Sequence, residues 1–282
     1  MKKTVYYFRW WTGILAFTFI ILSTSVFSQN GLIGNGFGTN DWSTTDDFGD
    51  GAGNSRILTT TANGTGYQYF RLVTNWDSNS NQWGPSSTAD DYKITIGSAV
   101  PSSEIIENST SKAYYIDVSD ANDNYVFKTK EGGNPPANKG LIIFEIQGAV
   151  RSISSVSQSP TSLNVNHGDN VTVTATLDGS LSTGQSVYLR YSDDSFTSST
   201  FVEMSGSGTS YSADIPASTN TSGNALAYYC FTSGDGLTIA HGDADFYTIN
   251  LINNSGNNYS YSVNGIPVLL TVDVSNQSGT NG

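Results

Sequence analysis

The feature that most constrains the fold is a long succession of short apolar runs separated by turn-forming residues. Between positions 56 and 147 these runs are RILTTT, YQYFRLVT, YKITI, AYYIDV, YVFKT and LIIFEIQ. Clusters of Gly, Asn, Asp or Pro bound the runs, and none of them shows the sustained period of a helix. This pattern predicts an all-β protein whose short strands are joined by tight turns.

A second set of runs begins at Val171 and alternates more cleanly. In VTVTATL, the residues Val171, Val173, Ala175 and Leu177 are expected on one face of a strand and the three threonines on the other. Six more runs follow before residue 264, namely SVYLRYS, TFVEM, SYSADI, ALAYYCFT, FYTINLI and YSYSV. Strands and turns at this spacing fit an immunoglobulin-like or fibronectin type III-like sandwich.

The fold class predicted from these patterns is two tandem antiparallel β-sandwiches after a cleaved signal peptide. We expect a signal peptide at 1–28, a jelly-roll-like front sandwich at 29–150, a linker at 151–158, a rear sandwich at 159–264, and an extra strand with a flexible tail at 265–282.

The first 28 residues have the form of a secretory signal peptide. Lys2, Lys3 and Arg9 precede the apolar run GILAFTFIIL, and STSVFSQN then offers a cleavage point before Gln29. A membrane span needs about 20 apolar residues, and this run is shorter. The sequence therefore predicts an extracellular or cell-surface protein that is not inserted in the membrane after cleavage.

The charge of the chain restricts its partners. Removing Lys2, Lys3 and Arg9 lowers the formal net charge from −12 to −15. Such a charge repels nucleic acids and anionic lipids, so neutral glycans, cations or proteins are the expected partners. The single cysteine, Cys230, lies within ALAYYCFT, where we expect it to be buried as a small apolar residue.

Longer stretches resemble parts of known proteins. VYLRYSDDSFTSSTFVEMSGSGTSYSADIPAS, with ALAYYCFTSGDG and DADFYTINLINNSGNNYSYSV, resembles the immunoglobulin-like module of secreted modular proteins from Bacteroidetes-type bacteria. NGLIGNGFGTNDWS with YFRLVTNWDSNSNQWGPSS resembles the module that precedes it there. The resemblance implies export and a β fold. In that group such modules accompany glycoside hydrolases, other hydrolases or surface-binding domains, often with a C-terminal secretion-sorting domain.

Aromatic and polar residues in the front sandwich suggest a sugar-binding surface. Sugar rings stack on exposed aromatic side chains, while Asp, Asn and Gln bind the hydroxyls. The candidate residues are Trp76, Trp83, Asp77, Asn81, Gln82 and Trp42. The alternative is that the tryptophans fill the core of the sandwich.

Two acidic stretches offer weaker candidate sites. TTDDFGDGAGN supplies oxygen ligands for a structural calcium ion at Asp46, Asp47, Asp50 and Asn54, although the EF-hand spacing is absent and a solvated loop of Asx-turns is favoured. In IAHGDADFY, the side chains of His241, Asp243 and Asp245 would share one face of a strand, but a solvated turn is favoured there as well.

The sequence holds none of the familiar catalytic motifs. G-x-S-x-G, H-E-x-x-H and a phosphate-binding loop are all missing. We therefore predict a non-catalytic module, without a cofactor, that binds a neutral polysaccharide or cell-surface glycan. The alternatives are a structural or adhesive cell-surface module and the accessory N-terminal part of a larger secreted hydrolase.

Overall fold

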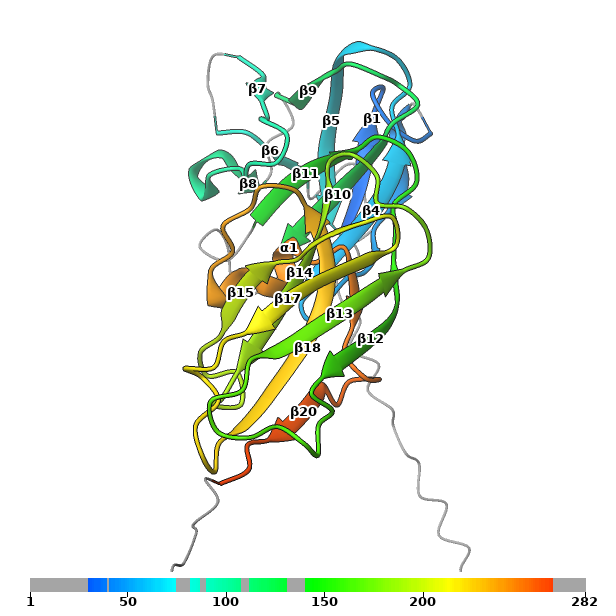
Figure 1. The fold of residues 1–282 in the computed structure, drawn as a ribbon. Helices are drawn as coiled ribbons and strands as arrows, with labels where there is room; N and C mark the ends of the chain where they lie inside the picture. Colours follow the sequence, from blue (N-terminus) through cyan, green and yellow to red (C-terminus); the bar gives the residue numbers. More distant parts are fainter. Residues whose placement is uncertain are drawn as a thin grey trace, which may run out of the picture.

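The computed structural model describes residues 30–39, 41–74, 82–86, 90–107, 112–130 and 140–265. Strands dominate this part of the chain, whose helices are one short α-helix and two 3-10 turns. The strands form four sheets, two in the front sandwich and two in the rear sandwich, which confirms the predicted all-β class. The two sandwiches are stacked along the long axis of the molecule (Figure 1).

The front sandwich contains a seven-stranded and a four-stranded sheet. The larger sheet has the order β2-β1-β5-β6-β8, with β9 paired to β5 and to β7, and the smaller has the order β11-β10-β4-β3. The bounds are β1 (Asn30–Gly34), β2 (Asp41–Asp47), β3 (Gly49–Asp50), β4 (Ser55–Thr61), β5 (Gly66–Thr74), β6 (Gln82–Gly84), β7 (Tyr92–Lys93), the 3-10 turn η1 (Ser102–Glu104), β8 (Ile106–Glu107), β9 (Tyr114–Val118), β10 (Asn124–Lys130) and β11 (Gly140–Ile146).

Aromatic rings from both sheets form the centre of the front core. The ring of Phe37 lies 5.0 Å from that of Phe127 and 5.5 Å from that of Tyr125, and Phe70 lies 5.2 Å from Phe127. These four side chains are fully buried. Edge-to-face contacts of this kind stabilise a core beyond the burial of their area.

The rear sandwich contains a four-stranded and a five-stranded sheet. Their orders are β12-β13-β17-β16 and β15-β14-β18-β19, with β20 paired to β18. The bounds are β12 (Ile153–Ser159), β13 (Val171–Leu177), β14 (Gln185–Ser192), β15 (Thr200–Glu203), β16 (Ser205–Ser207), β17 (Ser210–Ile215), β18 (Ala225–Gly234), the 3-10 turn η2 (His241–Asp243), α1 (Ala244–Tyr247), β19 (Asn250–Ile252) and β20 (Tyr259–Ser262).

Strand β13 has the inward and outward faces that its alternation predicts. Its apolar side chains are buried in the rear core, whereas its threonines are only half-buried. Cys230 on β18 is fully buried in the same core, as expected. The period of two in the sequence therefore corresponds directly to the two faces of this strand.

The predicted linker at 151–158 is corrected by the structure. Most of it belongs to strand β12, which pairs antiparallel with β13. Ile153 and Val156 pack against the rear core, while the serines between them face solvent. Because β12 is an edge strand that is covered on one side only, its sequence is mostly polar and resembles a loop.

Two predictions concern parts of the chain that lie outside the described residues. The signal peptide at 1–28 is one, and the extra strand and tail at 265–282, except for Gly265, are the other. Within the described ranges, no helix is long and apolar enough to cross a membrane.

The two sandwiches share an apolar contact. Val126 of β10 and the residues Ile142, Phe144 and Ile146 of β11 pack with Phe246 of α1 and with Ile249. These β10 and β11 side chains point away from the front core, so these two strands of the smaller front sheet are buried on both faces. Helix α1 lies at this joint (Figure 1).

Candidate functional site

The predicted sugar-binding loop is mostly outside the described residues. Trp76, Asp77 and Asn81 all fall within 75–81. Their proposed contact with sugar therefore stays a prediction from sequence.

Trp83 and Gln82 are not exposed as the sugar-binding prediction requires. They form the short strand β6, in which Trp83 is opposite Leu72 of β5. Trp83 is 4% exposed within the front core, and Gln82 is 7% exposed. Strand β6 pairs with both β5 and β8, and the Trp83 ring is directed into the sandwich rather than into solvent.

Of the three sugar-binding candidates that lie within the described ranges, Trp42 is the accessible one. It lies on the edge strand β2 and is 39% exposed. The guanidinium carbon of Arg71 lies 5.1 Å from the centre of its ring. Arg71 is itself fixed, because its Nε donates to the carbonyl of Lys112 at 2.6 Å and its Nη1 donates to Gln82 Oε1 at 3.0 Å.

Three tyrosines continue this surface across the larger front sheet. Tyr67 and Tyr69 alternate on β5, on the face opposite Phe70. The ring of Tyr115 on β9 lies 5.1 Å from that of Tyr67 and 5.2 Å from that of Tyr69. Tyr67 is 57% exposed. We call the surface formed by Trp42, Tyr67, Tyr69 and Tyr115 the aromatic face.

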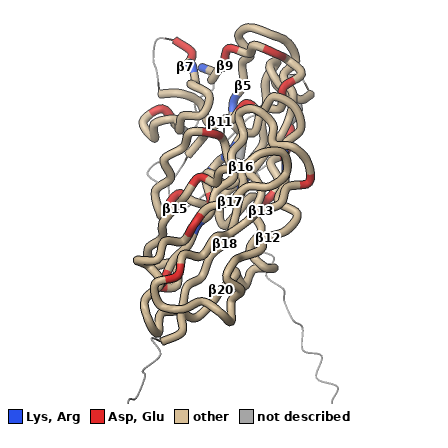
Figure 2. Tube along the Cα trace, in the orientation of Figure 1, with Lys and Arg blue, Asp and Glu red and all other residues tan. Residues whose placement is uncertain are grey.

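Charged groups border the aromatic face. Lys93 on β7 lies 5.5 Å from the centre of the Tyr67 ring, and its Nζ is 3.3 Å from Asp117 Oδ2. Partial burial lowers the pKa of Arg71, and Asp91 acts against that shift. In Figure 2, basic segments lie at β5 and beside β7 and β9. Positively charged donors and negatively charged acceptors of hydrogen bonds thus lie next to the exposed rings.

The predicted calcium ligands are distributed over separate contacts. Asp46 Oδ2 accepts a hydrogen bond from the backbone N–H of Thr39 at 2.9 Å. Asp50 forms an ion pair with Arg56. The described residues contain no group of three or more His, Cys, Asp or Glu side chains that could hold a metal ion. Asp46, Asp47, Asp50 and Asn54 are therefore not gathered into a metal site.

The segment with His241, Asp243 and Asp245 begins with a turn rather than a strand; Asp245 is exposed, whereas His241 and Asp243 are half-buried. It forms η2 and α1 at the joint between the sandwiches. His241 Nδ1 lies 2.8 Å from Ser199 Oγ and 3.2 Å from Nη2 of Arg190, which contacts three aromatic rings. Asp243 pairs with Lys130 on β10 at 2.7 Å. These contacts cannot be recognised in the sequence, because the partners are more than 40 residues away along the chain.

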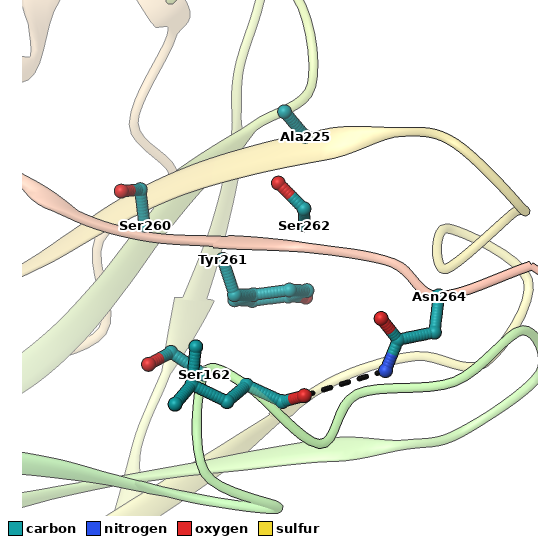
Figure 3. A pocket seen from close by; sticks show the side chains of 7 residues that line it. Ser162, Ala225, Ser260, Tyr261, Ser262 and Asn264 are labelled. Carbon is teal, nitrogen blue, oxygen red and sulfur yellow. Dashed lines mark hydrogen bonds between the residues drawn. The ribbon is translucent and has the colours of Figure 1, made fainter.

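A cavity of about 330 Å³ lies at the end of the rear sandwich that is remote from the joint. Its lining residues are Ser162, Leu163, Ala225, Ser260, Tyr261, Ser262 and Asn264 (Figure 3). The Tyr261 hydroxyl already donates to Asn220 Oδ1 at 2.7 Å. The lining contains no carboxylate, amine or imidazole, so it offers no charged group for binding or catalysis.

The aromatic face therefore has the best geometry for recognising another molecule among the described residues. The chain matches no protein-family model, no curated protein and no solved structure.

Proposed function

We propose that the protein is a secreted, non-catalytic binding module that recognises a neutral polysaccharide through the aromatic face of its front sandwich. The observation that carries this proposal is the exposure of Trp42 and Tyr67 on one face of the larger front sheet, together with the neighbouring rings of Tyr69 on β5 and Tyr115 on β9. Aromatic side chains that occupy no core position leave their ring faces available for the C–H groups of sugars.

The polar groups around the rings support the same class of ligand. Asp117 and Lys93 provide an acceptor and a donor beside Tyr67, and Arg71 provides donors beside Trp42. An open surface leaves much of a sugar chain hydrated, so binding by one module is weak. Secretion follows from the signal-peptide pattern of residues 1–28.

The rear sandwich is proposed to be an immunoglobulin-like module that supports the front sandwich. In such folds strands A, B, E and D form one sheet and C, F and G form the other. The orders β12-β13-β17-β16 and β15-β14-β18-β19 fit that arrangement, with β15 as an additional strand beside C.

Affinity electrophoresis of residues 29–282 tests the proposal. The gels contain starch, xylan, laminarin or other neutral polysaccharides, and the variants are Trp42→Ala and Tyr67→Ala. The control is Leu163→Ala, because Leu163 is 85% exposed but lies in the rear sandwich. We expect one glycan to retard the protein and the control, and the two front variants to migrate freely.

Two results would overturn the proposal. Free migration in every gel would favour a structural or adhesive module. Retardation that is lost in Trp76→Ala but kept in Trp42→Ala and Tyr67→Ala would move the site to the loop at 75–81.

A further inference from the structure

A segment of the rear sandwich reaches over the smaller sheet of the front sandwich. It comprises residues 235–249, which connect β18 to β19 and contain η2 and α1. We call this segment the strap. Phe246 and Ile249 of the strap pack against Val126, Ile142 and Phe144. The ring of Phe246 approaches Gly140 so closely that a Cβ there would lie 3.0 Å from its Cζ.

The strap covers a lysine that is completely buried. Lys128 on β10 is 0% exposed, and its side chain is on the face of β10 that carries Val126 and Lys130. Its Nζ donates a hydrogen bond to Ser55 Oγ at 2.8 Å. The loop before Ser55 also closes over it, because a Cβ on Gly51 would lie 2.8 Å from Nζ. A serine hydroxyl compensates an ammonium ion much less than a carboxylate does.

The charged groups around Lys128 do not remove the cost of burying its charge. Asp245 of the strap favours the charged form, and Asp243 is already paired with Lys130. From β3 and β4 the nearby charges are Asp50 and Arg56, which pair with each other, and the residue opposite on β11 is Ile142. Burial dominates and lowers the pKa of Lys128 to about 7, with Asp245 opposing the shift.

We propose that the strap closes over β10 with release of a proton from Lys128, so that its hold on the front sandwich tightens as the pH rises. In the open state the lysine is hydrated and carries –NH₃⁺. In the closed state above about pH 7 it is mainly –NH₂, still donating to Ser55, and the proton has passed to solvent. The closure constant then rises by up to about tenfold per pH unit between the two pKa values, and it is independent of pH below both.

Hydrogen exchange of the strap amides in residues 29–282 measures this closure. Several of these amides are bonded within the rear sandwich, such as Ile249 N–H to the Thr232 carbonyl and Asp243 N–H to the Ala240 carbonyl. After correction for the intrinsic exchange rate, we expect protection of 235–249 to increase several-fold per unit between pH 7.5 and 9.5. Lys128→Met should remove the increase. Lys130→Met, the matched control, should lower protection by loss of the Asp243 pair and keep the increase.

A wild-type profile without the increase, or the same increase in Lys128→Met, would overturn the proposal. A second measurement needs no variant. In protein labelled with ¹³C at lysine Cε, one lysine should titrate well below the ordinary pKa of about 10.4. Titration of every lysine near the ordinary value would overturn the proposal even if Lys128→Met does not fold.

Discussion

At the residue scale, the tryptophans of the front sandwich have opposite environments. Trp83 is fixed in the core by β6, whereas Trp42 is on an edge strand with one side toward solvent. Nothing in the sequence around them separates the two, because both follow short polar stretches. Whether each tryptophan is buried depends on the face of the sheet to which it points once its strand has paired with its neighbours.

The first prediction compares the two tryptophans by chemical denaturation. Trp83→Ala should lower the free energy of unfolding by about 3–5 kcal/mol, because it leaves a cavity in a close-packed core. Trp42→Ala should lower it by less, by about 1 kcal/mol, since Trp42 is exposed on an edge strand and loses its contact with Arg71 rather than a core position. Equal effects of the two substitutions would contradict the assignment of Trp83 to the core.

A second residue-scale prediction concerns Cys230. Burial raises the pKa of its thiol to about 12, and the side chain is 0% exposed. The thiolate is the reactive form, so native protein should not react with a thiol reagent at pH 8 on the timescale in which a model thiol reacts completely. Denaturant should release one reactive thiol per chain. Rapid reaction of native protein would show that the rear core opens readily.

At the element scale, the alternation of apolar and polar residues predicted a strand where one face is apolar. It failed to predict a strand whose residues are only slightly buried. VTVTATL became β13 with the expected faces. ISSVSQS became β12 although only Ile153 and Val156 contact the core. YQYFRLVT contained the signal for the aromatic face, because Tyr67, Tyr69 and Arg71 alternate with the buried Phe70 and Leu72. The three-residue β6 was too short to predict.

The status of β12 as a strand is open to a direct test. Val156→Asp places a carboxylate against the rear core and should cost about 1–3 kcal/mol of unfolding free energy. Ser157→Asp, at the exposed neighbouring position, should change it by less than about 0.5 kcal/mol. In a solvated linker both substitutions would be neutral in urea denaturation.

At the scale of the whole molecule, the sequence predicted two β units but not how they meet. The joint combines apolar residues of β10 and β11 with a strap in which polar and apolar residues are mixed, and its contacts join residues more than 100 positions apart. Periodicity reports the faces of an element and cannot identify a partner at that separation. The sequence carries a trace of the joint in the continuous apolar runs YVF of β10 and LIIF of β11, which are buried on both faces.

Alanine substitutions at two glycines test how tightly the sandwiches pack at the joint. A Cβ on Gly234 would lie 2.3 Å from Cδ1 of the buried Phe144 ring, so Gly234→Ala should destabilise the protein by about 1–3 kcal/mol. Gly242→Ala in η2 meets no atom within 4 Å and should have an effect below about 0.5 kcal/mol. Thermal unfolding of both variants measures the difference, and a neutral Gly234→Ala would show that the sandwiches are not in tight contact.

We propose that the aromatic face binds glycan, and the fluorescence of Trp42 can report this binding. In residues 29–282 with Trp76→Phe and Trp83→Phe, Trp42 is the remaining tryptophan. Acrylamide should quench this exposed ring in the free protein, and an oligosaccharide of the glycan that retards the protein should protect it and shift its emission. Unchanged quenching at a saturating concentration of that oligosaccharide would contradict the claim.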